Sequence, residues 1–423
     1  MGGGMATGAV EPYGREGLNL EDARHTILES LKGRSPLPTE RMPLKSSLGR
    51  VCALDAIAAA DVPGFRASIM DGYALAQITQ PEPSQRWTLQ GLSAPGQPYV
   101  RPLNRGEAIR ILTGAPLPEG AHWVLPQEVV TVDDGILHLD QRVSDQSWIR
   151  AADEECRQGD VLIERGKRLT AADLGRLASC GIQSMHVHRS PRIGLLITGD
   201  ELVPAGARRP PGSIWESNSM LLGALLNNLN QTITDLRVVA DQPDQLKQAL
   251  EDLAQHCDVI VSTGGISAGD SDWIRTVVEQ IGTIAFWKLF LKPGRPFAYG
   301  TLNTNIPFFG LPGNPVAAAI TALQLLWPAL QLIEGQQVPE TFPRLRVRLA
   351  AQLQRRPGRP ELARARLHCN ADGDLFAELD GSQASSRIGS LAHADLLLEI
   401  PAEADRLPMG SELWAQLIRR PLF

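Results

Sequence analysis

Residues 190–330 alternate short apolar runs with amphipathic stretches, and this alternation constrains the fold more than any other feature of the 423-residue chain. The runs with strand character cover 193–198, 233–239, 258–262, about 284–291 and 306–311. The stretches with helix character cover 220–229, 243–256, about 272–281 and the residues after Pro315. Strands and helices that alternate in this way form a mostly parallel sheet with helices on both faces.

The segments on either side of this α/β unit have different patterns. Helix patterns at 19–32 and 170–181 enclose a Pro- and Gly-rich stretch with short strand-like runs. After residue 340, alternating runs and the turns Asp372-Gly373 and Asp380-Gly381 predict hairpins in a small β-barrel or sandwich. We predict four units: a split, mainly helical N-terminal domain (19–64 and 151–190), an inserted small β domain (65–150), the α/β domain (191–335) and a C-terminal β domain (341–423).

Composition places the chain among ordinary globular proteins. Hydrophobic residues make up 43% and charged residues 21%, which argues against a disordered chain or a coiled coil. The formal charge of −6 is too small to indicate a nucleic-acid or membrane partner. The N-terminal residues lack the pattern of a secretion signal, and the apolar stretch 316–333 contains polar residues and a proline, so we predict a buried helix there. The five scattered cysteines lack the spacing of a zinc site, and we expect a cytoplasmic protein with reduced thiols.

Three turns follow predicted strands of the α/β unit, where sheets of this kind bind ligands. They read TGDEL (198–202), STGGISAGDSDW (262–273) and GLPGNP (310–315). The second has the glycine spacing of a phosphate loop, but Asp270 stands where a Walker loop has lysine, which argues against a Walker-type ATPase. Its backbone amides can still hold a phosphate or a similar oxyanion. Alternatively, its glycines only permit a tight turn.

Carboxylates in the first two turns indicate a metal site. Glu201, Asp270 and Asp272 would meet at one edge of the sheet, where hydrated Mg²⁺ takes one or two carboxylates together with substrate phosphates. Asp270 and Asp272 also stand where a helix begins, so N-capping is the alternative for each of them.

Two groups of basic residues are candidates for anion binding. Lys288 and Lys292 are four residues apart in an apolar strand pattern, which would place both on one face. Protective lysines on an edge strand are the alternative. Residues 344–366 contain eight arginines and one acid, Glu361. A solvated barrel face is the commonest explanation of such a run, an anion site built from one or two arginines comes next, and the lack of interleaved aromatic residues argues against nucleic acid.

Six motifs together resemble a known family. They are SIMDGYAL (68–75), RILTGAPLPEG (110–120), TGDEL (198–202), STGGISAGDSDW (262–273), AFWKLFLKPGRPFAYG (285–300) and GLPGNPVAA (310–318). In this order and spacing they resemble the molybdopterin molybdenumtransferases of the bacterial MoeA type, whose eukaryotic counterpart is the gephyrin E domain. The resemblance covers the chain from about residue 19. It implies an elongated homodimer with a cleft shared between subunits, an α/β domain like the molybdopterin adenylyltransferases, and a C-terminal β-barrel.

The resemblance also implies an activity. Adenylylated molybdopterin and molybdate would be the substrates, and a Mg²⁺-dependent hydrolysis of the adenylate would yield molybdenum cofactor and AMP. The implied catalytic residues are Asp71, Thr113, Glu201, Asp241 and Asp272, and the metal ligands remain those predicted from the turns: Glu201, Asp270 and Asp272. The implied substrate- and anion-binding residues are Ser267, Lys288, Lys292, Pro312, Gly313, Asn314, Arg364 and Ser385. Ser385 follows alanine and precedes serine, where the family usually has Gly-Ser-Gly.

Two other functions are compatible with the same resemblance. A scaffold of the gephyrin type would bind partners without turnover, but the sequence shows no long linker or second fused domain. A molybdopterin adenylyltransferase would share the α/β domain, but the inserted β domain and the C-terminal barrel argue against it. For the transferase, the expected partners are a second copy of the chain, the adenylyltransferase and the molybdoenzymes that accept the cofactor.

Overall fold

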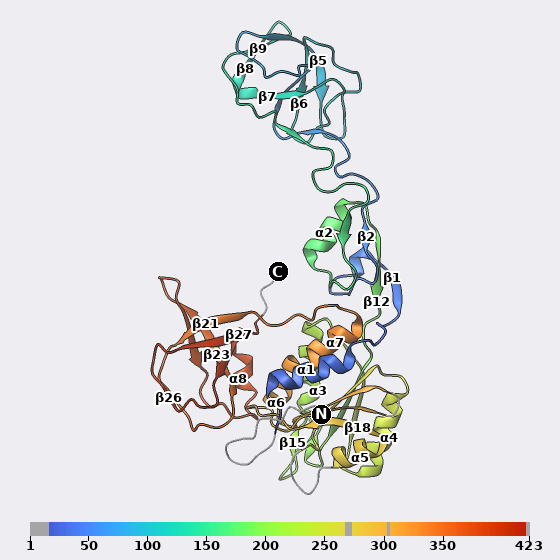
Figure 1. Cartoon of the computed structure of the whole chain (residues 1–423), viewed down its shortest axis with the longest axis vertical. Helices are drawn as coiled ribbons and strands as arrows, with labels where there is room; N and C mark the ends of the chain where they lie inside the picture. The colour runs from blue at the N-terminus through green and yellow to red at the C-terminus, as the bar shows by residue number, and fades with distance from the viewer. Residues whose placement is uncertain (1–16, 267–272, 303–304, 420–423) are drawn as a thin grey trace, which may run out of the picture.

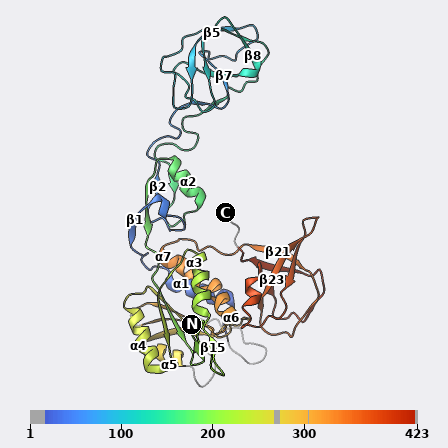
Figure 2. The same cartoon turned by 180° about the vertical axis from the view of Figure 1, so that it is seen from behind.

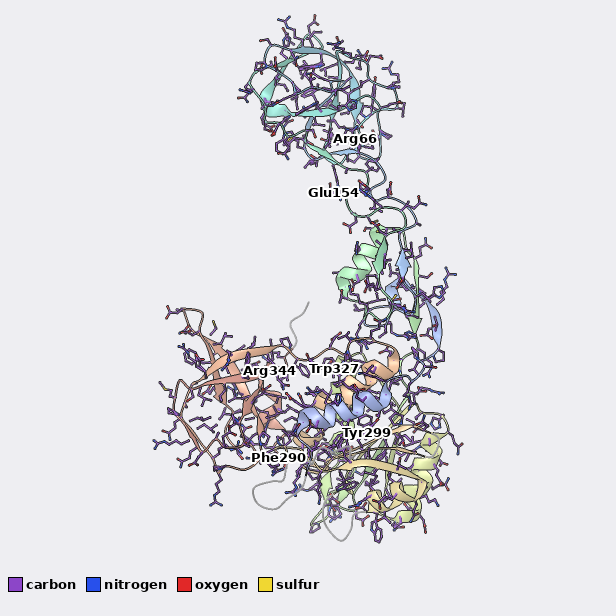
Figure 3. The ribbon with its side chains drawn as sticks, viewed as in Figure 1. Arg66, Glu154, Phe290, Tyr299, Trp327 and Arg344 are labelled. Carbon is purple, nitrogen blue, oxygen red and sulfur yellow. The ribbon has the colours of Figure 1, made fainter. Side chains whose placement is uncertain are left out.

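The computed structural model describes residues 17–266, 273–302 and 305–419. The molecule is elongated, with a small β unit at one end and an α/β unit beside a barrel at the other (Figures 1 and 2). A narrow neck joins the two ends, and Arg66 and Glu154 lie where the chain enters and leaves the distal β unit (Figure 3).

The α/β unit is built on a six-stranded sheet in the order β16-β13-β17-β20-β19-β18. Four strands are parallel: β13 (Ile193–Thr198), β16 (Ile233–Val239), β17 (Val259–Thr263) and β20 (Pro307–Leu311). The strands β18 (Gly282–Trp287) and β19 (Ala298–Leu302) complete it in antiparallel pairing. The mostly parallel sheet is as predicted, and β19 is a strand that the sequence patterns did not indicate.

Helices cover both faces of this sheet because its central strands are apolar on both sides. In β13, Leu195 and Ile197 point into one core and Leu196 into the other. The first core packs against α1 (Leu20–Leu31), α3 (Asn218–Asn228), α6 (Pro315–Thr321) and α7 (Trp327–Glu334). The second packs against α4 (Pro243–Ala254) and α5 (Trp273–Ile281). Helix α1, predicted within 19–64, therefore packs beneath the sheet, with Asn19 as its N-cap as expected.

The helix after Pro315 is buried, as predicted. Residues Pro315–Glu334 form the one helix in the described part of the chain that is long and apolar enough to cross a membrane, and 94% of its apolar window is buried in the protein. A π-helical turn, Ala322–Leu326, interrupts it just before Pro328. Proline cannot donate to the carbonyl four residues earlier, and Arg24 Nε of α1 donates to that carbonyl, of Gln324, instead (3.1 Å).

The neck contains more strand than its sequence indicated. The strand β1 (Thr39–Pro43) pairs with β12 (Ser184–His188), and β2 (Ala56–Ile57) pairs with β11 (Val161–Ile163). The helix here is α2 (Ala171–Ser179), whose Thr170–Asp173 capping box was predicted. The prediction of mainly helix is wrong here, because prolines at 36, 38, 43 and 63 keep the chain extended.

The distal unit is a small β structure, as predicted. Its sheet has the order β7-β4-β6-β5-β9-β8. The strands are β4 (Gly72–Leu75), β5 (Arg86–Ser93), β6 (Glu107–Ile111), β7 (Trp123–Pro126), β8 (Val130–Asp133) and β9 (Ile136–Leu139). Short pairs elsewhere are β3 (Ala67–Ser68) with β10 (Ile149–Arg150), β14 (Leu202–Val203) with β15 (Ile214–Trp215), and β22 (Leu353–Gln354) with β26 (Arg406–Leu407).

The C-terminal unit is a closed barrel and not a sandwich. Its order is β21-β24-β23-β25-β27. The strands are β21 (Arg344–Leu349), β23 (Glu361–Cys369), β24 (Leu375–Leu379), β25 (Leu396–Ile400) and β27 (Glu412–Leu417), with α8 (Gly389–Ala392) before β25. The Asp372-Gly373 turn joins a hairpin, as predicted. The hairpin expected at Asp380-Gly381 is wrong, because β23 and β21 already occupy both edges of β24.

Candidate functional site

A cavity of about 980 Å³ lies beyond the carboxyl ends of the parallel strands, between the α/β sheet and the barrel. The three turns predicted from the sequence all contribute to its lining, together with a loop of the barrel. The lining residues used below are Glu201, Asn218, Gly264, Lys292, Gly313 and Ser385.

Two glycines let the turn after β17 approach its neighbour. Gly264 and Gly265 have positive φ angles of 88° and 62°. A Cβ atom at Gly264 would lie 2.1 Å from the carbonyl oxygen of Thr198 at the end of β13. Glycine is therefore required here for close packing of two adjacent turns. The rest of the turn, with the predicted site residues Ser267, Asp270 and Asp272, lies outside the described residues, so the predicted metal ligands from this turn stay a prediction.

Three carboxylates gather at the ends of β13 and β16. Thr198 Oγ1 donates to Asp241 Oδ1 (2.8 Å), and the backbone N–H of Asp241 donates to Asp200 Oδ1 (3.0 Å). Burial raises the pKa of Asp241, and the charges of Asp200 and Glu201 raise it further, against the opposing hydrogen bond from Thr198. Asp200 was not predicted as a site residue, although it stands beside Glu201 in TGDEL. Among the described residues, no three acidic, His or Cys side chains are arranged to hold a metal by themselves.

The two predicted lysines do not share a face. The strand expected over 284–291 ends at Trp287, and Lys288 has a positive φ of 79°, which breaks the alternation of side chains. Lys292 lines the cavity, whereas Lys288 is not among the lining residues. The argument from strand spacing is therefore wrong, although Lys292 does reach the site. Its Nζ pairs with Glu361 at 3.0 Å.

The PGNP turn is held in place by a side chain that the sequence analysis did not identify. Asn218, at the first turn of α3, donates from Nδ2 to the carbonyl of Gly313 (2.8 Å) and to Thr263 Oγ1 (3.3 Å). The side chain is 7% exposed and ties two of the predicted turns together. An asparagine at a helix start is usually interpreted as a cap, so no local signal distinguished it. Pro312, Gly313 and Asn314 line the cavity.

Arg364 does not reach the surface of the cavity. It is fully buried in β23 and does not line the cavity. Its Nη2 donates to the carbonyl of Ala384 (3.0 Å) and its Nε to Ser390 Oγ (3.1 Å), and burial lowers its pKa. Ser385 does line the cavity, and its carbonyl accepts from the N–H of Val316 at the start of α6 (3.0 Å). Arg364 thus supports the loop that presents Ser385.

The remaining predicted pair lies at the opposite end of the molecule. Asp71 Oδ1 accepts hydrogen bonds from Thr113 N and Oγ1, both at 2.8 Å, and these bonds lower the pKa of Asp71. Both residues are exposed in the distal β unit, next to β4 and β6, far from the six-stranded sheet (Figures 1 and 2). A single protomer does not bring this pair to the cavity.

Comparison with known proteins agrees with this arrangement. Family models match residues 18–181 (MoeA N-terminal region, domain I and II), 194–332 (probable molybdopterin binding domain) and 346–417 (MoeA C-terminal region, domain IV). A molybdopterin molybdenumtransferase from Haemophilus influenzae is 33% identical over 394 residues, covering 93% of this chain and 96% of the relative. The chain belongs to the MoeA family.

Other members and relatives of the MoeA family extend the comparison. A gephyrin from Dictyostelium discoideum is 28% identical, covering 90% of this chain and 59% of that protein. The crystal structure of a molybdopterin biosynthesis MoeA protein from Pyrococcus horikoshii OT3 covers 95% of this chain and 100% of its own, at 26% identity and a TM-score of 0.80. The predicted MoeA-type architecture is therefore confirmed.

Proposed function

We propose that this MoeA-family protein is a transferase of molybdenum cofactor biosynthesis. It takes adenylylated molybdopterin and molybdate, hydrolyses the adenylate and releases molybdenum cofactor and AMP. The observation that carries the proposal is the cavity at the carboxyl ends of the parallel strands, which joins a glycine turn, carboxylates and Lys292. The glycine turn and Lys292 suit a ligand with several oxyanion charges, and the carboxylates suit a cation bound together with it. The similarity to molybdopterin molybdenumtransferases supports the same activity.

The residues of the cavity and of the turns beside it have separable roles in this proposal. Lys292 attracts molybdate or phosphate oxygens, and Ser385 can donate a hydrogen bond to the same group. Asn218 and Gly264 keep the turns at a fixed separation. The carboxylate of Asp241 accepts from Thr198, so its free oxygen is directed by that bond.

The carboxylates at the ends of β13 and β16, of which Glu201 lines the cavity, fit Mg²⁺. Burial raises the pKa of Asp241 most, and the charges of Asp200 and Glu201 raise it further; a divalent cation would relieve the part that comes from this repulsion. Glu201 and Asp241 are the described residues that would hold it, with Asp270 and Asp272 as the predicted additions. When bound, Mg²⁺ supplies charge stabilisation at the adenylate phosphate.

We further propose a homodimer whose partner completes the site. Asp71 and Thr113 are far from the cavity of their own protomer, so they can act only in the cavity of another copy (Figure 1). Apolar side chains near one edge of the sheet support association: Leu236 and Val238 of the edge strand β16 are 47% and 58% exposed, and Met220 of α3 is 73% exposed. A cytoplasmic location and a division into four units, with α1 packed on the α/β core and not in the neck, complete the proposal.

The experiment measures the catalytic activity and the molecular mass of the purified protein. Purified protein is incubated with adenylylated molybdopterin, Mg²⁺ and molybdate, and AMP release and cofactor formation are followed. Light scattering should give a mass near twice 45.9 kDa. A protein that binds ligand without releasing AMP would be a scaffold, and one that forms the adenylate from ATP would be an adenylyltransferase. A fully active monomer would contradict the shared site.

A further inference from the structure

A buried acid contacts the lysine that lines the cavity. Glu361, the first residue of β23, is 4% exposed, and its Oε1 and Oε2 lie 3.0 and 3.1 Å from Lys292 Nζ. Arg355, also nearly buried, has Nε 3.8 Å from Glu361 Oε2. Lys292 lines the cavity and its side chain is 44% exposed, whereas Glu361 does not line it. The ammonium group thus lies between a buried carboxylate and the space where an anion would bind.

Backbone hydrogen bonds hold the main chain around Lys292 and Glu361 in place, but they do not hold the lysine side chain. Lys292 N donates to the carbonyl of Pro360 (2.9 Å), and Leu362 N donates to the carbonyl of Lys292 (2.8 Å). These bonds join the loop after β18 to the barrel strand β23. A lysine ammonium ends a flexible four-carbon stem, so its position depends on its partner. In the described residues, Glu361 is the carboxylate that lies within ion-pair distance of it.

We propose that Glu361 is a positioning residue for the anion site: it holds the Lys292 ammonium at the cavity wall and offsets part of its charge. This inference rests on the proposed function, because it takes Lys292 to be an oxyanion-binding group. A buried carboxylate needs a cation nearby, so Glu361 keeps Lys292 from extending into the cavity. Its charge also opposes an anion bound to the same ammonium. The anion is therefore bound in a defined place and can be released.

The test replaces the charge and keeps the shape. In Glu361→Gln, molybdate should bind roughly three- to tenfold more tightly by calorimetry, because the lysine charge is no longer offset. Turnover measured as AMP release should fall, because the ammonium loses its fixed position. A merely structural role would lower the melting temperature and leave molybdate affinity unchanged. Should Glu361→Gln fail to fold, Glu361→Asp replaces it in the test. The shorter side chain draws the carboxylate back from Lys292, so molybdate affinity should rise and turnover should fall by smaller amounts.

Two further proteins make the test specific. Glu399→Gln is the matched control: Glu399 faces Leu362 across the β23–β25 pairing but binds Arg344 (Nη2–Oε2 2.6 Å), so molybdate affinity should stay that of the wild type. In a Lys292→Met background, Glu361→Gln should no longer change molybdate affinity. An unchanged or weaker affinity in Glu361→Gln, or an equal gain in the Lys292→Met background, overturns the inference. If the wild-type protein binds no molybdate, the proposed function fails, and this inference fails with it.

Discussion

Replacement of Arg168 by methionine tests the joint between the neck and the α/β unit. Arg168 Nη2 pairs with Glu334 Oε2 at the end of α7 (2.7 Å), and both side chains are nearly inaccessible, at 7% and 0%. Arg168 also donates from Nη1 to the carbonyl of Gly49 and from Nε to Gln336 Oε1. Glu334 Oε1 has no hydrogen-bond partner within the described ranges, so the carboxylate depends on Arg168 and on one bond from Gln231.

The expected destabilisation by Arg168→Met follows from the burial of this ion pair. Removal of one partner from a buried ion pair leaves an uncompensated charge and destabilises by about 3–5 kcal/mol. At roughly 2–4 °C per kcal/mol for a unit of this size, Arg168→Met should lower the melting temperature by about 6–20 °C. A second replacement, Glu334→Gln, removes the stranded charge, keeps an acceptor for Gln231 and should recover most of the loss.

The assay is differential scanning calorimetry at neutral pH. Arg275→Met is the control, because Arg275 and Glu279 form an ion pair of similar length (2.9 Å) with both side chains about half exposed. Such a surface pair contributes roughly 0–1 kcal/mol, so the control should melt close to the wild type. If Arg168→Met also melts within about 2 °C of the wild type, the reasoning from burial is refuted.

Three further outcomes test individual site residues. Lys292→Ala removes a charge-assisted bond of roughly 1.5–3 kcal/mol and should weaken molybdate binding by at least about tenfold in calorimetry, whereas a mere edge-strand lysine would leave binding unchanged. Asp241→Asn should raise the melting temperature at pH 7, because the raised pKa of Asp241 means that the folded state favours the protonated acid. This gain in melting temperature should vanish as the pH falls below the ordinary aspartate range, and a lower melting temperature at pH 7 would contradict the prediction. Thr113→Val removes one of the two hydrogen bonds to Asp71 and should move the lowered pKa of that carboxyl upward in an NMR titration; an unmoved pKa would show that the hydroxyl contributes nothing. The stability linked to the lowered pKa is present above the ordinary aspartate pKa and is lost as the pH falls through the folded-state value.

Local interactions let the sequence alone determine much of the fold. The alternation that predicted β13, β16 and β17 records which side chains must be buried, and the Thr170–Asp173 capping box sets the start of α2 within four residues. A tight turn was one of two interpretations of the glycines at 264 and 265, and the structure adds the carbonyl of Thr198 that a side chain at Gly264 would strike. These features depend on residues that are neighbours in the chain or on the burial of a single helix or strand, so a sequence pattern can predict them.

The site depends on contacts that no local pattern contains. Lys292 and Glu361 are paired across 69 residues, and Asn218 reaches Gly313 across 95. Lys288 was misplaced because the strand ends at Trp287 and the positive φ of Lys288 breaks the alternation of side chains expected there. Tertiary packing decided that Arg364 supports a loop and that Asp71 lies far from the cavity. Packing decides the positions of these side chains because their desolvation and pairing arise only when segments distant in the sequence come into contact. The free energy of burying a charge depends on the groups that surround it in the folded protein.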